Sequence, residues 1–478
     1  MKNFFLFVLL SGLINAQTIQ LSEVDKQILS YTYNEDFSQA KKIAGEEIKN
    51  NSSSPKYYYY LINTMIMEYY QKVALLDPEK RDEGRKTLNK EIISYCESVT
   101  EKFEEIKLNT ENKFYFGTIY GFLARVYGVD GSWWSAFRSG KKAKAFMEDV
   151  LKASPQFYDA YLVLGMLDYY SDRMSGITSF IAGALGFSGN RERGLQFLKT
   201  AFNKGTLTFG QSALTLMEVY ANLEDNSYAA IPYFEAFLKT YSQNKRTFNS
   251  YCQLLLNIWD INAVARLMKN DKMNLMENII KARYYDMIGN SEMAVRYATL
   301  TLQQSSLLRG SENSARYILA FNYWLTGDNT NAFKFERQLN ERAQETFALV
   351  KKYPNENKWL RILQTRAINN IKNEEMDSFL QSKPNFKYAP QIENEVNLIL
   401  GQYFFNNNQY EKAESYFNLV SASEQEREKY VALRFLIEIY NRQNVSAAKV
   451  KKLLSLIDDA DNDRLKFRAN DLEKKYKL

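Results

Sequence analysis

The chain has 478 residues, with 62 Lys and Arg against 56 Asp and Glu, a formal net charge of +6 and no histidine. The absence of histidine excludes Ser-His-Asp and Cys-His catalysis and almost every zinc arrangement. Charges of both signs are mixed along the chain, which is typical of a solvated surface and not of a nucleic-acid-binding stripe. We therefore expect no nucleic-acid partner, no metal site and no cofactor.

The first residues have the pattern of an export signal. A single cation, Lys2, precedes an apolar run over residues 4–10, and the small residue Ala16 stands at the expected cleavage site. Such a run is too short to cross a bilayer and is typical of a signal peptide. Residues 1–16 are therefore predicted to be a signal peptide, with a retained anchor as the alternative. The mature protein is expected to be exported, to the periplasm, the outer membrane or the medium.

Nearly continuous helix is expected after this signal, because 7 prolines and 20 glycines are few for the length of the chain. Pro155 ends the first series of helices, and Asp159 is placed to cap the helix that follows. The helices expected before Pro155 are a pair within residues 17–50, then 57–72, a helix that ends at 103, 112–127 and 133–153.

A repeated spacing runs through these helices and on toward the C-terminus. An aromatic residue is followed four positions later by a turn residue and nine positions later by an alanine. This spacing indicates a helix hairpin in which a large and a small residue let the two backbones approach, and its repetition predicts a helical solenoid. The aromatic and alanine pairs are Tyr31/Ala40, Tyr220/Ala229, Tyr285/Ala294, Tyr323/Ala332 and Phe404/Ala413.

Two of these stretches resemble the tetratricopeptide repeat. Residues 155–165 read P-x-x-x-D-A-Y-x-x-L-G, and residues 400–417 place Leu-Gly, an aromatic, Ala and Phe at the offsets of the repeat consensus. Ala298 and Glu336 stand where two other units should have the second-helix aromatic. The resemblance implies an all-α fold, namely a tetratricopeptide-like right-handed α-solenoid of stacked helix hairpins.

An apolar insert interrupts the repeat that begins near Tyr161. Residues 174–190 carry no charge and are rich in Gly and Ala, and the second helix of the repeat is delayed until about Arg191. Two interpretations are open: a short helix buried in the superhelix, or an exposed apolar lip that contacts a lipid or a partner. The candidate lip residues are Ile177, Phe180, Ile181, Leu185 and Phe187.

The end of this insert resembles the signature of the family that includes tetratricopeptide repeat protein 39 and the fungal inclusion-body clearance protein. That family shows G-F-x-G-[DN]-[RK]-x-x-G-L-x-x-L after an apolar stretch. Gly189-Asn190 suits a helix start, and Gly194 suits a close helix crossing. The resemblance implies a repeat array at organelle membranes and lipid droplets, without catalytic residues, whereas an export signal departs from that setting. The matching residues are Gly186, Phe187, Gly189, Asn190, Arg191, Gly194, Leu195 and Leu198.

Helix pairs continue after residue 203 without a long linker. Residues 461–478 are expected to form a polar capping helix whose basic residues lie on an exposed face. We therefore predict that residues 17–478 form a single tetratricopeptide-like solenoid with the 174–190 insert. Cys96 and Cys252 both stand in apolar helical contexts. Two buried free thiols are favoured, and a bridge between them stays open in an oxidising compartment.

The repeat pattern favours an exported, non-catalytic scaffold that binds a protein or peptide in its concave groove. One alternative is a peripheral envelope protein that contacts a membrane or lipid through the 174–190 insert. Another is a hydrolase on an α-superhelix, which would need a compact catalytic domain for which the repeats leave no room, so we do not expect an enzyme. The candidate groove residues are the first-helix tyrosines Tyr31, Tyr161, Tyr220, Tyr285 and Tyr323.

Overall fold

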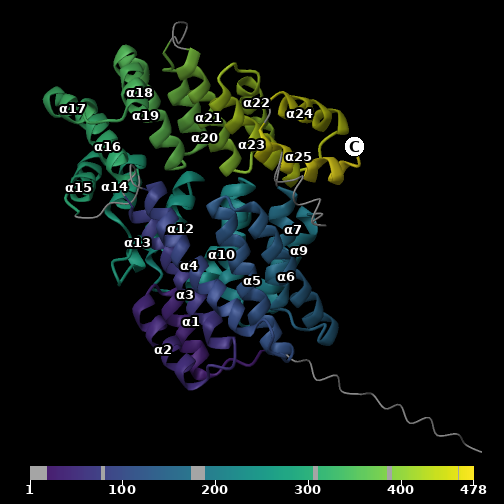
Figure 1. Ribbon diagram of the computed structural model, residues 1–478. Helices are drawn as coiled ribbons and strands as arrows, with labels where there is room; N and C mark the ends of the chain where they lie inside the picture. Colours follow the sequence, from purple (N-terminus) through teal and green to yellow (C-terminus); the bar gives the residue numbers. More distant parts are fainter. Residues whose placement is uncertain (1–18, 77–80, 174–188, 305–309, 385–389, 461) are drawn as a thin grey trace, which may run out of the picture. The chain divides into compact units, whose positions relative to one another are not determined.

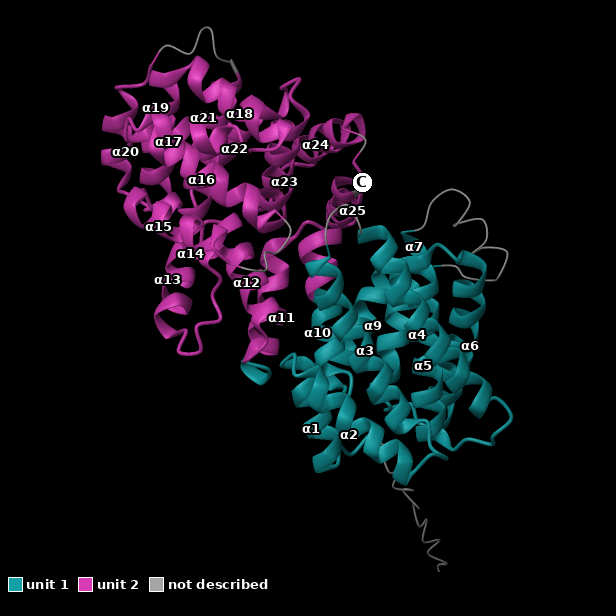
Figure 2. Cartoon of the chain, turned by 60° about the vertical axis from the view of Figure 1, so that its left-hand side comes forward, with its two compact units in different colours: residues 1–216, 239–242 teal, residues 217–238, 243–478 magenta. Residues whose placement is uncertain are grey.

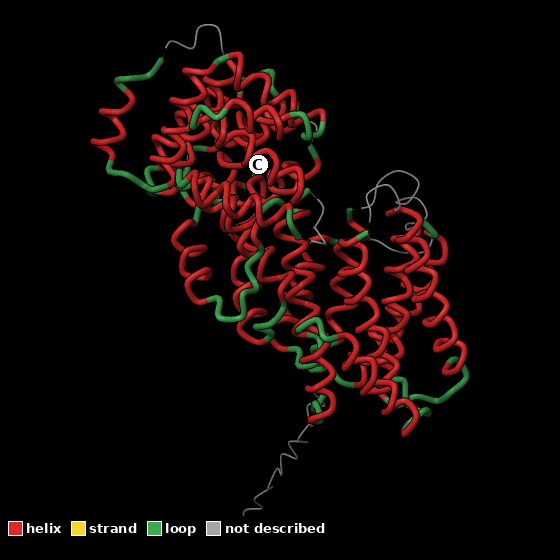
Figure 3. Tube along the Cα trace, turned by 90° about the vertical axis from the view of Figure 1, so that its left-hand side faces the viewer, coloured by secondary structure: helices red, strands yellow, loops and turns green. Residues whose placement is uncertain are grey.

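The computed structural model describes residues 19–76, 81–173, 189–304, 310–384, 390–460 and 462–478. Within these ranges the secondary structure is helical without a strand, as Figures 1 and 3 show. The predicted all-α fold is therefore confirmed. The helices fall into two compact units, residues 1–216 with 239–242 and residues 217–238 with 243–478 (Figure 2). The prediction that residues 17–478 form one solenoid stays a prediction.

Unit 1 packs its helices around buried aromatic rings. Tyr59 stacks on Phe122 with ring centroids 5.7 Å apart, and it also contacts Phe114 and Tyr115. All four rings are buried, so much of the apolar surface that stabilises this unit is aromatic. The helices of unit 1 are α1 (Glu23–Tyr33), α2 (Phe37–Asn50), α3 (Lys56–Leu75), α4 (Arg81–Phe103), α5 (Thr110–Asp130), α6 (Trp133–Ala153), α7 (Ala160–Asp172), α9 (Arg191–Lys204) and most of α10 (Phe209–Glu218).

Unit 2 is a stack of helix hairpins, in which α14 packs on α15, α15 on α16 and α16 on α17. This is the helical solenoid that the repeated spacing predicts. Its elements are a π-helix (Val219–Leu223), most of α11 (Ser227–Thr240), α12 (Lys245–Asn257), α13 (Ile261–Asn270), α14 (Asn278–Met287), α15 (Ser291–Leu302), α16 (Ser311–Leu325), α17 (Asn329–Glu336), α18 (Glu341–Lys352), α19 (Pro354–Ile368), α20 (Asn373–Leu380), α21 (Pro390–Asn406), α22 (Tyr410–Ser421), α23 (Glu426–Arg442), α24 (Ala447–Asp459) and α25 (Asp463–Tyr476).

The hairpin between α14 and α15 explains the repeated spacing. Gly289, four residues after Tyr285, has a φ of 81°, and the N–H of Asn290 donates to the carbonyl oxygen of Tyr285 at 2.9 Å. The Asn290 side chain then accepts from the N–H of Met293 and caps α15, and Ala294 is fully buried. A left-handed residue followed by a cap ends one helix and starts the next. Positive φ recurs at the same offset in Glu35, Gly327 and Asn408.

The hairpin that begins with Tyr220 differs by one residue. The π-helix Val219–Leu223 accommodates one extra residue in this turn. The left-handed residue is therefore Asp225, five positions after Tyr220, with a φ of 47°. The buried alanine is Ala230, and the predicted Ala229 is partly exposed. The prediction of Ala229 as the small packing residue is wrong because the π-helix shifts the register.

Asp159 does not cap α7. Its backbone is helical and its side chain makes no cap hydrogen bond there. Its Oδ1 instead accepts from both the backbone N–H and the hydroxyl of Thr208, each at 2.8 Å, which ties the start of α7 to the start of α10. Sequence spacing misses this partner because it lies 49 residues away along the chain.

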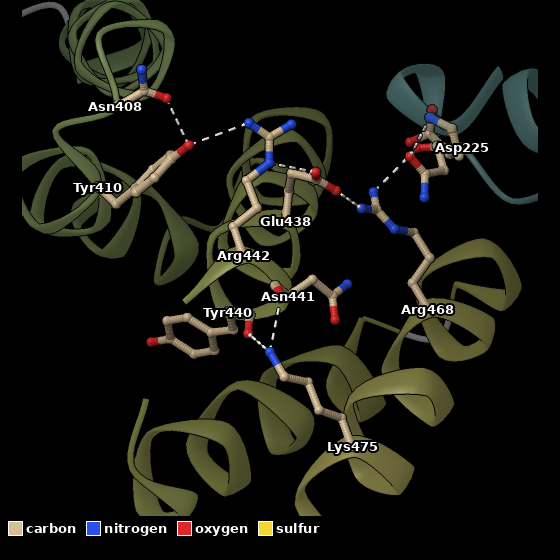
Figure 4. A network of polar contacts seen from close by, with 11 residues as sticks. Asp225, Asn408, Tyr410, Glu438, Tyr440, Asn441, Arg442, Arg468 and Lys475 are labelled. Atoms are coloured by element: carbon tan, nitrogen blue, oxygen red, sulfur yellow. Dashed lines mark hydrogen bonds and ion pairs between the residues drawn. The ribbon is translucent and has the colours of Figure 1, made fainter. Parts of the chain in front are cut away.

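The last helix, α25, is the predicted C-terminal cap, but one of its basic residues is not on an exposed face. Arg468 is buried, and its Nη2 donates to Glu438 Oε2 at 2.7 Å (Figure 4). Its Nη1 donates to the carbonyl oxygen of Asp225 at 3.2 Å. Lys475 donates to the main-chain carbonyl of Tyr440 at 2.9 Å. The polar cap is therefore attached to α23 by charged groups as well as by buried leucines.

Both cysteines are free and buried, Cys96 in unit 1 and Cys252 in unit 2. Burial raises the pKa of each thiol to about 12, so neither forms a thiolate at neutral pH. We expect Ellman's reagent to react with neither thiol of the native protein, and with both after unfolding in guanidinium chloride. Rapid reaction of the native protein would contradict the burial, and failure of the unreduced, unfolded protein to react would reveal a bridge.

Candidate peptide-binding groove

One candidate site among the described residues is a cavity of about 580 Å³ in unit 2, here called the groove cavity. The described residues that line it lie on α12, α14, α16, α19 and α23, each the first helix of a hairpin, and in the turn after α12. First helices line the concave surface of a tetratricopeptide-like solenoid. The lining residues are Leu256, Asn257, Trp259, Arg283, Asp286, Met287, Asn313, Ser314, Tyr317, Ile318, Gln364 and Arg434.

Asp286 contributes a carboxylate to the groove cavity, and side chains from neighbouring helices already bind this carboxylate. Its Oδ1 accepts from Arg361 Nη2 of α19 and from Asn322 Nδ2 of α16, each at 2.7 Å. The same Arg361 nitrogen also donates to the main-chain carbonyl of Asp286. The Arg361 side chain is 10% exposed and that of Asp286 is 19% exposed, so water screens this pair only weakly. Asp286 therefore joins α14 to α19, and its charge is offset.

Arg283 is a cation in the groove cavity that forms no ion pair with a described carboxylate. Its side chain is half-buried, and its Nη2 donates to the amide oxygen of Asn257 at 3.3 Å. Among the described ion pairs none includes Arg283. Burial lowers the pKa of its guanidinium, and the charge of Asp286 opposes this shift in part. An arginine stays protonated in a protein, so the cavity contains a positive charge without a bound counter-ion.

Arg434 adds a second positive charge to the groove cavity, with a looser ion pair. Its Nη1 lies 3.4 Å from Oδ1 of Asp225, whose Oδ2 accepts from the Tyr430 hydroxyl at 2.6 Å. Beside it, burial raises the pKa of the cavity residue Tyr317 to about 12, so this phenol stays a hydrogen-bond donor. The cavity thus combines cationic, phenolic and amide groups with apolar walls.

The predicted groove tyrosines lie mainly against their own hairpins. Tyr161 packs on Phe197 at 5.0 Å between ring centroids, and Tyr31 is half-buried on α1. None of the five predicted tyrosines is among the residues that line the groove cavity. Their role in binding stays a prediction. Parallel stacks join Tyr220 to Tyr233, Tyr285 to Tyr297 and Tyr323 to Phe335, at 5.7, 5.6 and 6.0 Å.

These stacks also explain the two repeat units that lack an aromatic residue at the consensus position of the second helix. The second-helix ring lies twelve positions after the first-helix aromatic, at Tyr297 and Phe335, one residue before Ala298 and Glu336. The cavity residues could have been found from the same anchors. At about 100° per residue, Arg283 and Met287 lie roughly 200° around α14 from Tyr285, on the opposite face. On α14, the residues two positions from the anchor aromatic are therefore the ones that line the groove cavity.

The family-like motif in unit 1 shapes a close crossing of α7 and α9. Asn190 caps α9 by accepting from the N–H of Arg193, as predicted. A Cβ on Gly194 would lie 2.6 Å from the main-chain nitrogen of Tyr169, and one on Gly165 would lie 3.0 Å from the carbonyl oxygen of Gly194. Only glycine fits at such a crossing, so the predicted helix start at Asn190 and the predicted close crossing at Gly194 are confirmed. Gly186 and Phe187 of the motif lie outside the described residues.

A smaller cavity of about 220 Å³ lies beside this crossing. Its charged groups include Asp168 and Arg193, whose two hydrogen bonds measure 2.5 and 2.8 Å and neutralise both side chains. All five candidate lip residues, Ile177, Phe180, Ile181, Leu185 and Phe187, lie outside the described residues.

The described ranges contain neither a cluster of metal-binding side chains nor a membrane-spanning helix. No group of three or more Cys, Asp or Glu side chains is placed there to bind a metal ion. No helix in those ranges has both the length and the apolar character that a membrane span needs.

No protein-family model matches the chain, and no curated protein matches it. Among solved structures, the chain is similar to the crystal structure of the P58(IPK) TPR domain, with a TM-score of 0.20 and 12% identity over 86% of this chain and 98% of that one. It is also similar to the structure of Naa15/Naa10 bound to HypK-THB, with a TM-score of 0.19 and 14% identity over 95% of this chain and 78% of that one. These values assign no partner or activity.

The fold is tetratricopeptide-like. Hairpin geometry carries this assignment, because the consensus glycine at Gly401 leaves room for the ring of Phe417. A Cβ on Gly401 would lie 2.6 Å from Phe417 Cε1. The ring of Phe404 stacks on Tyr416 at 5.6 Å, and Ala413 is fully buried. The unit that matches the consensus best thus packs as a repeat hairpin.

Proposed function

We propose that the chain is an exported, non-catalytic scaffold that binds a protein or peptide partner on the concave surface of unit 2. The observation that carries this proposal is the groove cavity, whose described lining residues come from first helices and the turn after α12. Its volume of about 580 Å³ falls in the size range of ligand sites. Export to the bacterial envelope is supported by the signal-like pattern of residues 1–16.

We also propose kinship with the family of tetratricopeptide repeat protein 39. The match of residues 186–198 to its signature supports this, as does the need for glycine at Gly194. Association with a lipid surface through the 174–190 insert has no support among the described residues. It becomes the preferred function only if the experiment below finds membrane sedimentation without a protein partner.

Crosslinking mass spectrometry on cells that express the tagged protein tests the scaffold. We expect reproducible crosslinks to one envelope protein from first-helix lysines of unit 2, such as Lys281 and Lys358, because these lie on helices that line the groove cavity. Lysines on second helices, such as Lys269 and Lys412, serve as the internal control and should crosslink less. The mature N-terminus should be Gln17. Absence of any protein crosslink, with the chain sedimenting with membranes, would contradict the scaffold.

A further inference from the structure

We propose that the groove cavity recognises a peptide segment that carries an Asp or Glu side chain, with Arg283 as the residue that binds the carboxylate. This inference rests on the proposed scaffold function and specifies the chemistry of its partner. Three observations carry it: an unpaired guanidinium, acids nearby that already have partners, and walls that suit a peptide.

The arginines around this part of unit 2 differ in their partners. Arg361 pairs with Asp286 at 2.7 Å, and Arg468 pairs with Glu438 at 2.7 Å. Arg283 has only the neutral amide oxygen of Asn257, at 3.3 Å. A half-buried cation without a counter-ion destabilises a fold unless water or a ligand compensates it. Arg283 is therefore available to an incoming anion.

The acids near Arg283 do not fill this role. Asp286 lies on the same helix, but its Oδ1 accepts from both Arg361 and Asn322. Burial raises the pKa of Glu395, another acid whose charge acts on Tyr317, and the charge of Arg427 opposes this shift. Arg434 contributes a second guanidinium with a contact of 3.4 Å to Asp225. The cavity keeps a local surplus of positive charge.

The remaining walls favour a peptide over a small inorganic anion. Trp259, Met287 and Ile318 offer apolar surface, and side-chain amides such as Asn313 and Gln364 can pair with a peptide backbone. A guanidinium binds a carboxylate through two parallel hydrogen bonds, which gives both strength and orientation. The complementary ligand is an acidic residue next to an apolar one in an extended or helical segment.

Selection from a phage-displayed library of random dodecapeptides, with the full-length mature chain as target, tests this inference. We expect the selected peptides to share an Asp or Glu beside an apolar residue. The best peptide is then synthesised with a fluorophore, together with its Asn or Gln counterpart, and binding is measured by fluorescence anisotropy. Arg283→Gln should weaken binding of the acidic peptide at least tenfold, because a charge-assisted pair is lost. The Asn or Gln counterpart should lose a similar factor against the unmodified chain.

Matched variants separate recognition from folding. Arg342→Gln removes an exposed arginine of α18 outside the groove cavity and should leave binding unchanged. Arg283→Glu should reverse the preference, so that a Lys-containing version of the peptide binds better than the acidic one. Circular dichroism establishes that each variant is folded, and a misfolded Arg283→Gln is replaced by the charge reversal.

Two outcomes overturn the inference and leave the scaffold intact. One is selection of peptides without acidic residues, and the other is equal binding of the acidic peptide by the unmodified chain and by Arg283→Gln. A library that yields no binding peptide also counts against the inference. The scaffold itself fails only if crosslinking in cells recovers no protein partner, so the two results are distinguishable.

Discussion

Replacing Gly194 by alanine is expected to lower the free energy of unfolding by about 3 kcal/mol. The added Cβ would lie 2.6 Å from the main-chain nitrogen of Tyr169 and 2.9 Å from the carbonyl oxygen of Gly165. Main-chain atoms cannot rotate away as a flexible side chain can, so α7 and α9 must separate and lose packing. Urea unfolding followed by circular dichroism measures the loss. Hydrogen exchange of peptides from both helices should show faster exchange there.

Gly45→Ala is the matched control for this substitution. Gly45 is also helical, but nothing lies within 4 Å of the position of its Cβ. There alanine should raise the free energy of unfolding by about 0.5–1 kcal/mol, because it lowers the entropy of the unfolded chain and favours helix. Both variants replace a helical glycine by alanine, but the free energy of unfolding is expected to fall for Gly194→Ala and to rise for Gly45→Ala. If Gly194→Ala unfolds like the unmodified chain, the crossing can relax and the motif glycine has no packing role.

Replacing Glu438 by alanine is expected to cost about 3–5 kcal/mol in unit 2, because it leaves a buried cation without its counter-ion. Figure 4 shows Glu438 between two arginines, with Arg468 Nη2 at 2.7 Å from one carboxylate oxygen and Arg442 Nε at 2.8 Å from the other. The Arg468 side chain is 5% exposed, and burial lowers the pKa of its guanidinium. Urea unfolding and hydrogen exchange in α23 and α25 measure the effect.

An exposed pair in the same unit is the control. Glu312 pairs with Arg316 one helical turn away, and the Glu312 side chain is 51% exposed. Glu312→Ala should therefore cost only about 0.3–0.5 kcal/mol. A double variant with Glu438→Leu and Arg468→Met should be more stable than Glu438→Ala, because it removes both buried charges. Equal costs for Glu438→Ala and Glu312→Ala would show that water reaches the Arg468 site.

Much of the local fold could be predicted because a repeat hairpin is specified over short spans of sequence. The turn after Tyr285 needs a left-handed residue, a cap and a small residue, and Gly289, Asn290 and Ala294 supply them within nine positions. The groove cavity could be predicted only as the concave face of first helices. The tyrosines chosen for it are the large anchor residues, and packing turns such residues toward their own hairpin.

The sequence by itself determined the helical class and the hairpin turns that follow the regular spacing, because propensity and capping act between near neighbours along the chain. Only the tertiary structure decided the one-residue shift at Val219–Leu223 and the partner of Asp159, which lies 49 residues away. It also decided that Asp286 binds Arg361, 75 residues further on, and so leaves Arg283 without a carboxylate. Which of several distant side chains binds a given partner depends on tertiary packing, so the spacing of residues along the sequence does not predict it.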